Sequence, residues 1–219
     1  MKFSLILTSL AAVASAAPGN IVQKRARVFT DKTFDELSIS GGKAGTAKAD
    51  AEAKLAGLPK DPAQLALVDK LDLSFLSHVN QICNQAEISG YTKTIAGSAP
   101  GEDVLALERG KIQNKVLKLT ATVLALQAQQ TKGDNVTARL EEETKKLEKN
   151  IALDVAEAGK TATGLKFDAN TASADATKVE KDEVLIAKAD EVINKSQELA
   201  GAGAKGKAEG KNKGDSSSE

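Results

Sequence analysis

The sequence predicts an all-α protein: a single bundle of four to five helices, followed by a C-terminal amphipathic segment and a disordered tail. The main observation is an apolar seam at heptad spacing in the stretch 102–130, which other helices must cover. Alanine-rich, charged stretches around it favour helix by propensity, and the compact part lacks β-type alternation of useful length. The seam residues are Leu105, Ile112, Val116, Leu119, Val123 and Leu126, widened by Leu117 and Leu124, with Lys111, Lys115 and Lys118 lying off it.

Residues that start and stop helices predict the elements before this seam. An alanine-rich helix is expected over 45–58, where the following proline ends it. The pair Asp61-Pro62 is a strong helix start, because an N-cap acceptor precedes a proline at the first helical position. This helix is expected to run to about Ala96, with a bend or break at Gly90.

After the seam, Gly133 is expected to stop the central helix, and Asp134 can cap another. The next helix is predicted from Val136 to about Thr163. Phe167 lies in the segment that closes the compact domain. The composition then shifts to fewer large apolar residues, and the chain ends in a low-complexity Gly/Lys/Ser stretch.

These observations divide the chain into five parts. They are a signal peptide at 1–16, a short pro-segment at 17–25, a helical bundle domain at 26–170, an amphipathic helical extension at 171–200 and a disordered tail at 201–219. The extension is expected to dock weakly on the bundle or not at all, because it carries few large apolar side chains.

The first residues predict secretion. A lysine, a short apolar core and a small-residue site are typical of a signal peptide, with cleavage between Ala16 and Ala17. The pair Lys24-Arg25 follows closely and resembles the dibasic site of a fungal kexin-type protease. Removing 1–25 leaves 27 basic against 30 acidic side chains, a net charge of −3.

That charge balance gives no electrostatic reason to expect a nucleic acid as partner. No later stretch approaches the roughly 20 apolar residues of a transmembrane segment, and the hydrophilic C-terminus lacks the apolar end of a GPI signal. One cysteine excludes an internal disulfide, so the fold must depend on its helical core.

The sequence indicates no catalytic, cofactor-binding or metal-binding residues. His78 is the single histidine, no nucleophile motif accompanies it, and a structural or neutral role is expected. Cys83 follows an apolar residue by one helical turn and is expected to be a buried, inert thiol, with an intermolecular disulfide as the alternative. The run 141–146 pairs acids with lysines at i,i+4, which favours a solvated helix face. The stretches 41–46 and 159–161 resemble a phosphate loop but fail its spacing.

Asn135 and Asn194 each begin an N-glycosylation sequon, which predicts modification sites in a secreted chain. Aromatic residues are scarce, so a carbohydrate-stacking surface built on Tyr91 and a few phenylalanines is not expected.

Several stretches resemble a known family. They are FTDKTFDELSISGGKAGTAKADAEA, DLSFLSHVNQICNQAE, ALERGKIQNKVLKLTATVLALQAQ and LEEETKKLEKNIALDVAEAGKTATGLKFDA, with GKIQNKVLKLTA the most specific part. Together they resemble ascomycete small secreted proteins, which are effector-like and largely uncharacterised, over Phe29 to Ala169. A broader likeness, in secretion signal and alanine-rich helices, is to fungal hydrophobic-surface-binding and cell-wall mannoproteins. Neither resemblance implies a role for any named residue.

The resemblance and the signal peptide together predict a secreted, non-enzymatic, effector-like fungal protein that binds an extracellular or host partner. The alternative is a structural protein associated with the cell wall or a hydrophobic surface. A homo-oligomer formed through helix packing or Cys83 also stays open. A hydrolase is the third class considered, and no paired acids, metal cluster or nucleophile supports it.

Overall fold

The computed structural model describes residues 26–172 and 179–211. The expected signal peptide and pro-segment, with Ala16–Ala17 and Lys24–Arg25, lie outside the described residues. The described part is all-α, as predicted. Its helices are α1 Phe34–Leu37, α2 Ala47–Lys54, α3 Pro62–Leu65, α4 Lys70–Gln85, the π-helix η1 Ala86–Thr92, α5 Lys93–Gly97, α6 Glu102–Thr131, α7 Thr137–Ala156 and α8 Glu183–Lys211.

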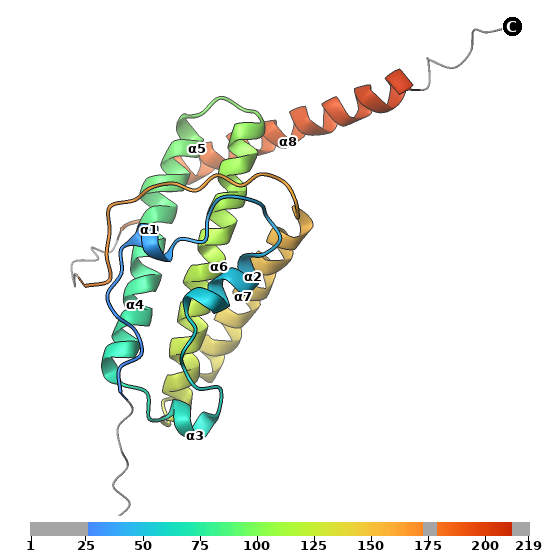
Figure 1. The fold of residues 1–219 in the computed structure, drawn as a ribbon. Helices are drawn as coiled ribbons and strands as arrows, with labels where there is room; N and C mark the ends of the chain where they lie inside the picture. Colours follow the sequence, from blue (N-terminus) through green and yellow to red (C-terminus); the bar gives the residue numbers. More distant parts are fainter. Residues whose placement is uncertain (1–25, 173–178, 212–219) are drawn as a thin grey trace, which may run out of the picture.

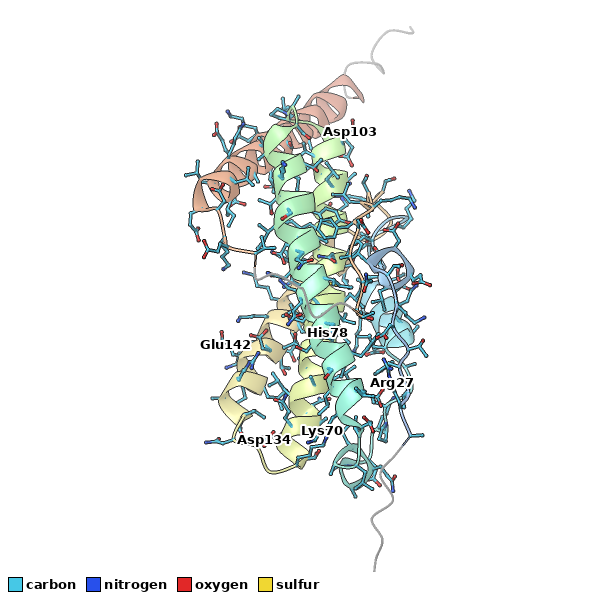
Figure 2. All side chains as sticks on the ribbon, turned by 90° about the vertical axis from the view of Figure 1, so that its left-hand side faces the viewer. Arg27, Lys70, His78, Asp103, Asp134 and Glu142 are labelled. Atoms are coloured by element: carbon cyan, nitrogen blue, oxygen red, sulfur yellow. The ribbon has the colours of Figure 1, made fainter. Side chains whose placement is uncertain are left out.

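The long helices α4, α6 and α7 lie side by side with α6 in the middle, and α8 crosses one end of the bundle (Figure 1). Figure 2 places Asp103 and Asp134 at opposite ends of this bundle. The central helix was predicted over 102–130, and its observed bounds confirm that prediction. It is buried on nearly every side, so even Lys111, off the apolar seam, is 6% exposed.

The prediction of one helix from Pro62 to Ala96 was wrong. Asp61 caps α3 as expected, since its carboxylate accepts from the amide of Ala63 at 2.9 Å. However, α3 ends at Leu65, and Asp69 then caps α4 by accepting from Leu71 at 2.8 Å. A second N-cap residue therefore overrides the continuous apolar pattern.

Gly90 does not break the helix but lies inside η1, where the helix widens to π geometry. An added Cβ at this glycine would lie 3.7 Å from side-chain atoms of Leu165 and Phe167, which is ordinary van der Waals contact. The segment after α7 therefore packs on η1 beside this glycine.

Two predicted helices are longer than the observed ones. The helix expected over 45–58 is limited to α2, because Gly45 and Gly57 have φ of +109° and +121°. The helix expected to reach Thr163 ends at Ala156, close to Gly159 with φ +82°. Gly133, with φ +95°, lies just past α6 as predicted.

Asp134 is not the N-cap of α7, because that position is Val136, which makes no side-chain capping bond. Instead, the carbonyl oxygen of Asp134 accepts a hydrogen bond from the amide of Val136 at 3.0 Å.

The segment before α2 and the segment after α7 run antiparallel across the face of the bundle (Figure 1). Backbone hydrogen bonds join Phe34 to Ala169 at 2.8 Å and Ala44 to Lys160 at 3.0 Å. We call these paired segments, residues 29–46 and 157–171, the two straps.

Both straps meet α6 at Gly110. The amide of Thr163 donates to the carbonyl of Ala106 at 2.8 Å, and the Ser40 hydroxyl donates to the carbonyl of Gly110 at 2.8 Å. A Cβ at Gly110 would lie 1.9 Å from the carbonyl oxygen of Thr163. The backbone approach therefore requires glycine at this position of α6.

α8 docks on the bundle, although weak or no docking was expected. Ala189 and Ile193 are buried against the cluster of Tyr91, Ile95 and Val104. The helix also continues through 201–211, the first part of the stretch expected to be disordered, while 212–219 lie outside the described residues.

The hydroxyl of Ser196, 1% exposed, accepts from the amide of Gly101 at 3.0 Å. α8 thus supplies a cap to the beginning of α6, whose own N-cap makes no side-chain bond.

Replacing Gly110 by alanine should destabilise the protein by at least about 2 kcal/mol, because the added methyl forces the strap away from α6. The matched control is Gly97→Ala in α5, where a Cβ would meet nothing within 4 Å. This control should change the free energy of unfolding by less than about 1 kcal/mol. Urea denaturation followed by circular dichroism measures the free energy of unfolding of both variants. Equal stability of the two variants would contradict the close contact between the strap and α6 at Gly110.

Candidate functional site

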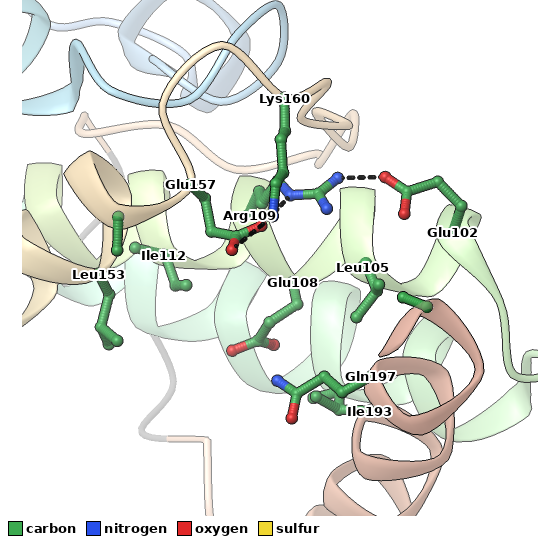
Figure 3. A pocket seen from close by; sticks show the side chains of 12 residues that line it. Glu102, Leu105, Glu108, Arg109, Ile112, Leu153, Glu157, Lys160, Ile193 and Gln197 are labelled. Atoms are coloured by element: carbon green, nitrogen blue, oxygen red, sulfur yellow. Dashed lines mark hydrogen bonds and ion pairs between the residues drawn. The ribbon is translucent and has the colours of Figure 1, made fainter. Parts of the chain in front are cut away.

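A cleft of about 590 Å³ opens between α6, the end of α7 and α8. We call it the α6–α8 cleft. Its wall is largely apolar, and an ion-pair network borders one side (Figure 3). The lining residues include Leu105, Ile112, Leu153, Ile193, Glu108 and Gln197.

The network is centred on Arg109, whose side chain is 4% exposed. Its guanidinium lies 2.6 Å from Glu102 and 2.9 Å from Glu157 and donates to the carbonyl of Thr161 at 2.9 Å. Lys160 pairs with the other oxygen of Glu157 at 2.9 Å (Figure 3). The planar guanidinium therefore ties α6 to the turn after α7 through bonds in fixed directions.

The apolar wall is only partly covered. Leu153, near the end of α7, is 42% exposed although it lines the cleft. Ile193 reaches the cleft from α8, and Figure 3 shows Glu108 of α6 and Gln197 of α8 facing the same space. The cleft thus offers an apolar floor with polar groups beside it, which is the composition of a binding site.

A second polar cluster lies where α6 faces η1. Glu87 accepts from two lysines of α6: Lys115 lies 3.2 Å from one carboxylate oxygen, and Lys118 pairs with the other. Burial opposes ionisation of this carboxyl, but the ammonium groups of Lys118 and Lys115 outweigh it and hold the pKa of Glu87 below its usual value.

His78 holds a strap against α4, and Cys83 is buried in the core. The Nδ1 of His78, at mid-length of α4 (Figure 2), donates to the carbonyl of Thr171 at 2.6 Å, which ties the strap to α4. Cys83 is completely buried, and burial raises the pKa of its thiol to about 12. The expected buried thiol is confirmed, and an intermolecular disulfide through Cys83 would require the core to open.

The other stretches singled out in the sequence also make structural contacts. Lys146 pairs with Glu142 at 2.7 Å and with Glu143 at 3.0 Å on the outer side of α7. The amide of Gly159 donates to the carbonyl of Ala44 at 3.0 Å, so the two stretches that resemble phosphate loops bind each other.

Asn135 is exposed in the turn between α6 and α7, and Asn194 is exposed on α8. Both sequon asparagines are thus open to solvent. Tyr91 is fully buried and its hydroxyl accepts from the amide of Leu165 at 3.2 Å, so it offers no stacking surface.

Two buried carboxylates were missed in the sequence. Asp72 accepts from the amides of Val28 and Phe29 at 3.0 and 2.9 Å, and Asp154 accepts from Ala47 at 2.9 Å. Asp72 thus anchors the beginning of the N-terminal strap, and Asp154 anchors α2. The available signal was an acid on the apolar side of a predicted helix, where a carboxylate must find hydrogen-bond donors.

Comparison with known proteins gives a family. A family model described as a domain of unknown function, DUF8454, matches residues 29–166, more than half of the chain. No curated protein and no solved structure matches the chain. The match includes α1 to α7 and the two places, Ser40 and Thr163, where the straps contact α6. α8 lies beyond the match.

None of the described helices combines the length and apolar composition needed to cross a bilayer. Within 26–172 and 179–211, no group of three or more His, Cys, Asp and Glu side chains is arranged to hold a metal ion.

Cys83 should not react with a thiol reagent in the folded protein. Its thiol is fully buried, so the reagent cannot reach it. Burial also raises its pKa to about 12, so almost no thiolate is present at pH 8. We expect no colour with Ellman's reagent under native conditions and one equivalent after unfolding in guanidinium chloride. Rapid labelling of the native protein would contradict this environment.

Replacing Glu87 by glutamine should reduce stability at pH 7 by about 2 kcal/mol, because Lys115 and Lys118 lose their shared carboxylate. Since the folded pKa is lowered, this contribution is complete above the unfolded value near 4.5 and is lost as pH falls through the folded pKa. The stability difference between wild type and variant should therefore shrink in acid. Urea titrations from pH 7 to pH 3 measure it, with exposed Glu141→Gln as the control.

Proposed function

This chain belongs to the DUF8454 family, and we propose that it is a secreted, non-enzymatic, effector-like fungal protein that binds an extracellular or host partner through the α6–α8 cleft. The observation that carries this proposal is the open apolar wall of the cleft, with Leu153 42% exposed beside a rigid ion-pair network. A partner that covers this wall removes apolar surface from water.

Secretion is supported by the N-terminal sequence, with its signal peptide and its dibasic pair, and by the resemblance to ascomycete small secreted proteins. Cleavage at these sites gives a protein that begins at Ala17 or at Ala26. N-terminal sequencing of protein from the culture filtrate distinguishes the two.

The non-enzymatic part of the proposal is supported by the roles of the reactive side chains. His78 is held by the carbonyl of Thr171, and Cys83 is buried with a raised thiol pKa. Arg109 has its guanidinium committed to Glu102 and Glu157. Each group therefore stabilises the fold in the arrangement observed.

The alternative function, association with the cell wall or a hydrophobic surface, is favoured by apolar side chains on the outside of α8. Val184 is 81% exposed and Leu199 is 58% exposed. Such residues on an amphipathic helix can contact an apolar surface. Adsorption to polystyrene and isolated cell wall that falls in a Val184→Asp, Leu199→Asp double variant would favour this alternative.

Leu153→Asp should weaken partner binding about tenfold, because it places a charge on the apolar wall. The matched control is Val155→Asp, two residues along α7, which is 56% exposed and does not line the cleft. Binding of labelled protein to host extracellular material measures the effect, after thermal melts show that both variants are folded.

Equal binding by Leu153→Asp and the wild type would contradict the cleft as the binding site. Fractionation of the fungus tests the location separately. Protein in the culture filtrate supports a diffusible binder, whereas retention on the wall until detergent extraction supports the alternative.

A further inference from the structure

A second pocket, of about 330 Å³, lies where α6, η1 and the beginning of α8 meet. We call it the lysine pocket. It is separate from the α6–α8 cleft and shares no lining residue with it. Its polar lining consists of Lys111, Lys115, Lys118, Lys181, Glu87, Asp190, Asn84 and Thr92, and its apolar lining of Ile88, Ile186 and Ala189.

The helix period gathers the lysines of α6 in this pocket. Lys111, Lys115 and Lys118 are separated by four and three residues, so they share one face of α6. That face is turned toward η1 and α8 rather than toward solvent: the three side chains are 8%, 31% and 16% exposed. Their ammonium groups are therefore partly withdrawn from water.

The acids near the pocket do not balance these lysines. Glu87 is a single carboxylate shared by Lys115 and Lys118, and Lys118 also donates to the side-chain oxygen of Asn84 at 3.2 Å. Lys111 pairs at 2.6 Å with Glu108, which does not line the pocket.

Lys181 and Asp190 add one charge of each sign from the α8 side. The four lysines thus face three carboxylates, with Glu108 included, which leaves one positive charge. Because the pocket is partly dehydrated, this charge interacts more strongly with an anion than it would at an open surface.

We propose that the lysine pocket binds a phosphate group, most favourably the phosphate of a small organic monoester. Ammonium groups donate short, charge-assisted hydrogen bonds to phosphate oxygens, and several lysines from one helix face suit its tetrahedral array of acceptors. Ile88, Ile186 and Ala189 supply an apolar side for the organic part of the ester.

The small size of the pocket and the net negative charge of the protein favour a small anion over a nucleic acid. The pocket is a recess of about 330 Å³ between helices, and the chain without residues 1–25 carries a net charge of −3. A long polyanion would meet that net negative field, whereas a single phosphate group meets the local positive charge.

The test uses the purified full-length protein and two probes, inorganic phosphate and phenyl phosphate, in isothermal titration calorimetry at constant ionic strength set with chloride. We expect one site per chain, with tighter binding of phenyl phosphate. Tighter binding of the ester identifies an organic phosphate as the ligand class, and equal binding identifies free phosphate. Both results support the site, and absence of binding of either probe at millimolar concentration overturns it.

Variants assign the binding to the pocket. Lys115→Met should weaken phosphate binding about tenfold by removing a partly buried positive charge. Lys181→Met, at an exposed position where folding is not at risk, should weaken it about threefold. Lys149→Met, an exposed lysine of α7 outside the pocket, is the matched control. Equal losses in all three variants, or no loss in the first two, would overturn the assignment.

Discussion

The close backbone contact at Gly110 is the constraint on which the arrangement depends. Two straps far apart in sequence cross the same turn of α6, and one carbonyl oxygen occupies the place that a side chain would need. Because the straps pair with each other and with α6, the beginning and end of the family domain are joined at its centre. A bundle of few aromatic residues is thereby closed by hydrogen bonds as well as by apolar packing.

The polar residues next to this glycine each have a defined contact. Gln113 accepts from the amide of Gly41 at 2.9 Å and donates to the carbonyl of Lys43 at 3.1 Å, which holds the first strap. Asn114 donates to the carbonyl of Cys83 at 2.8 Å, which joins α6 to α4. The segment that carries the family resemblance is therefore largely a set of structural contacts. Its lysines Lys115 and Lys118 pair with Glu87 and also line the lysine pocket.

The long helices could be predicted from the sequence because each carries a strong periodic signal. The heptad seam of α6 gave its bounds within one residue. The break before Asp69 could not be predicted with the same certainty, because an apolar pattern continued through it while a single capping side chain decided the outcome. After α7 the chain joins the strap pairing, for example between Lys43 and Thr161, and no local pattern predicts a pairing across more than a hundred residues.

The candidate sites were harder to predict from the sequence, because they also depend on residues that are brought together only by folding. Leu105 and Ile112 were read as seam residues of α6, yet the structure leaves them beside an open cleft. Glu87 and Lys118 lie on different elements, and their ion pair appears only after folding.

α8 contributes a wall both to the α6–α8 cleft and to the lysine pocket, with Ile193 and Gln197 in the cleft and Ile186 and Asp190 in the pocket. A ligand that requires α8 in this place, in either proposed site, would favour the same docked position of the helix. By thermodynamic linkage, each of two such ligands would then raise the affinity for the other by the same factor. One helix beyond the family match thus connects the two separate recesses.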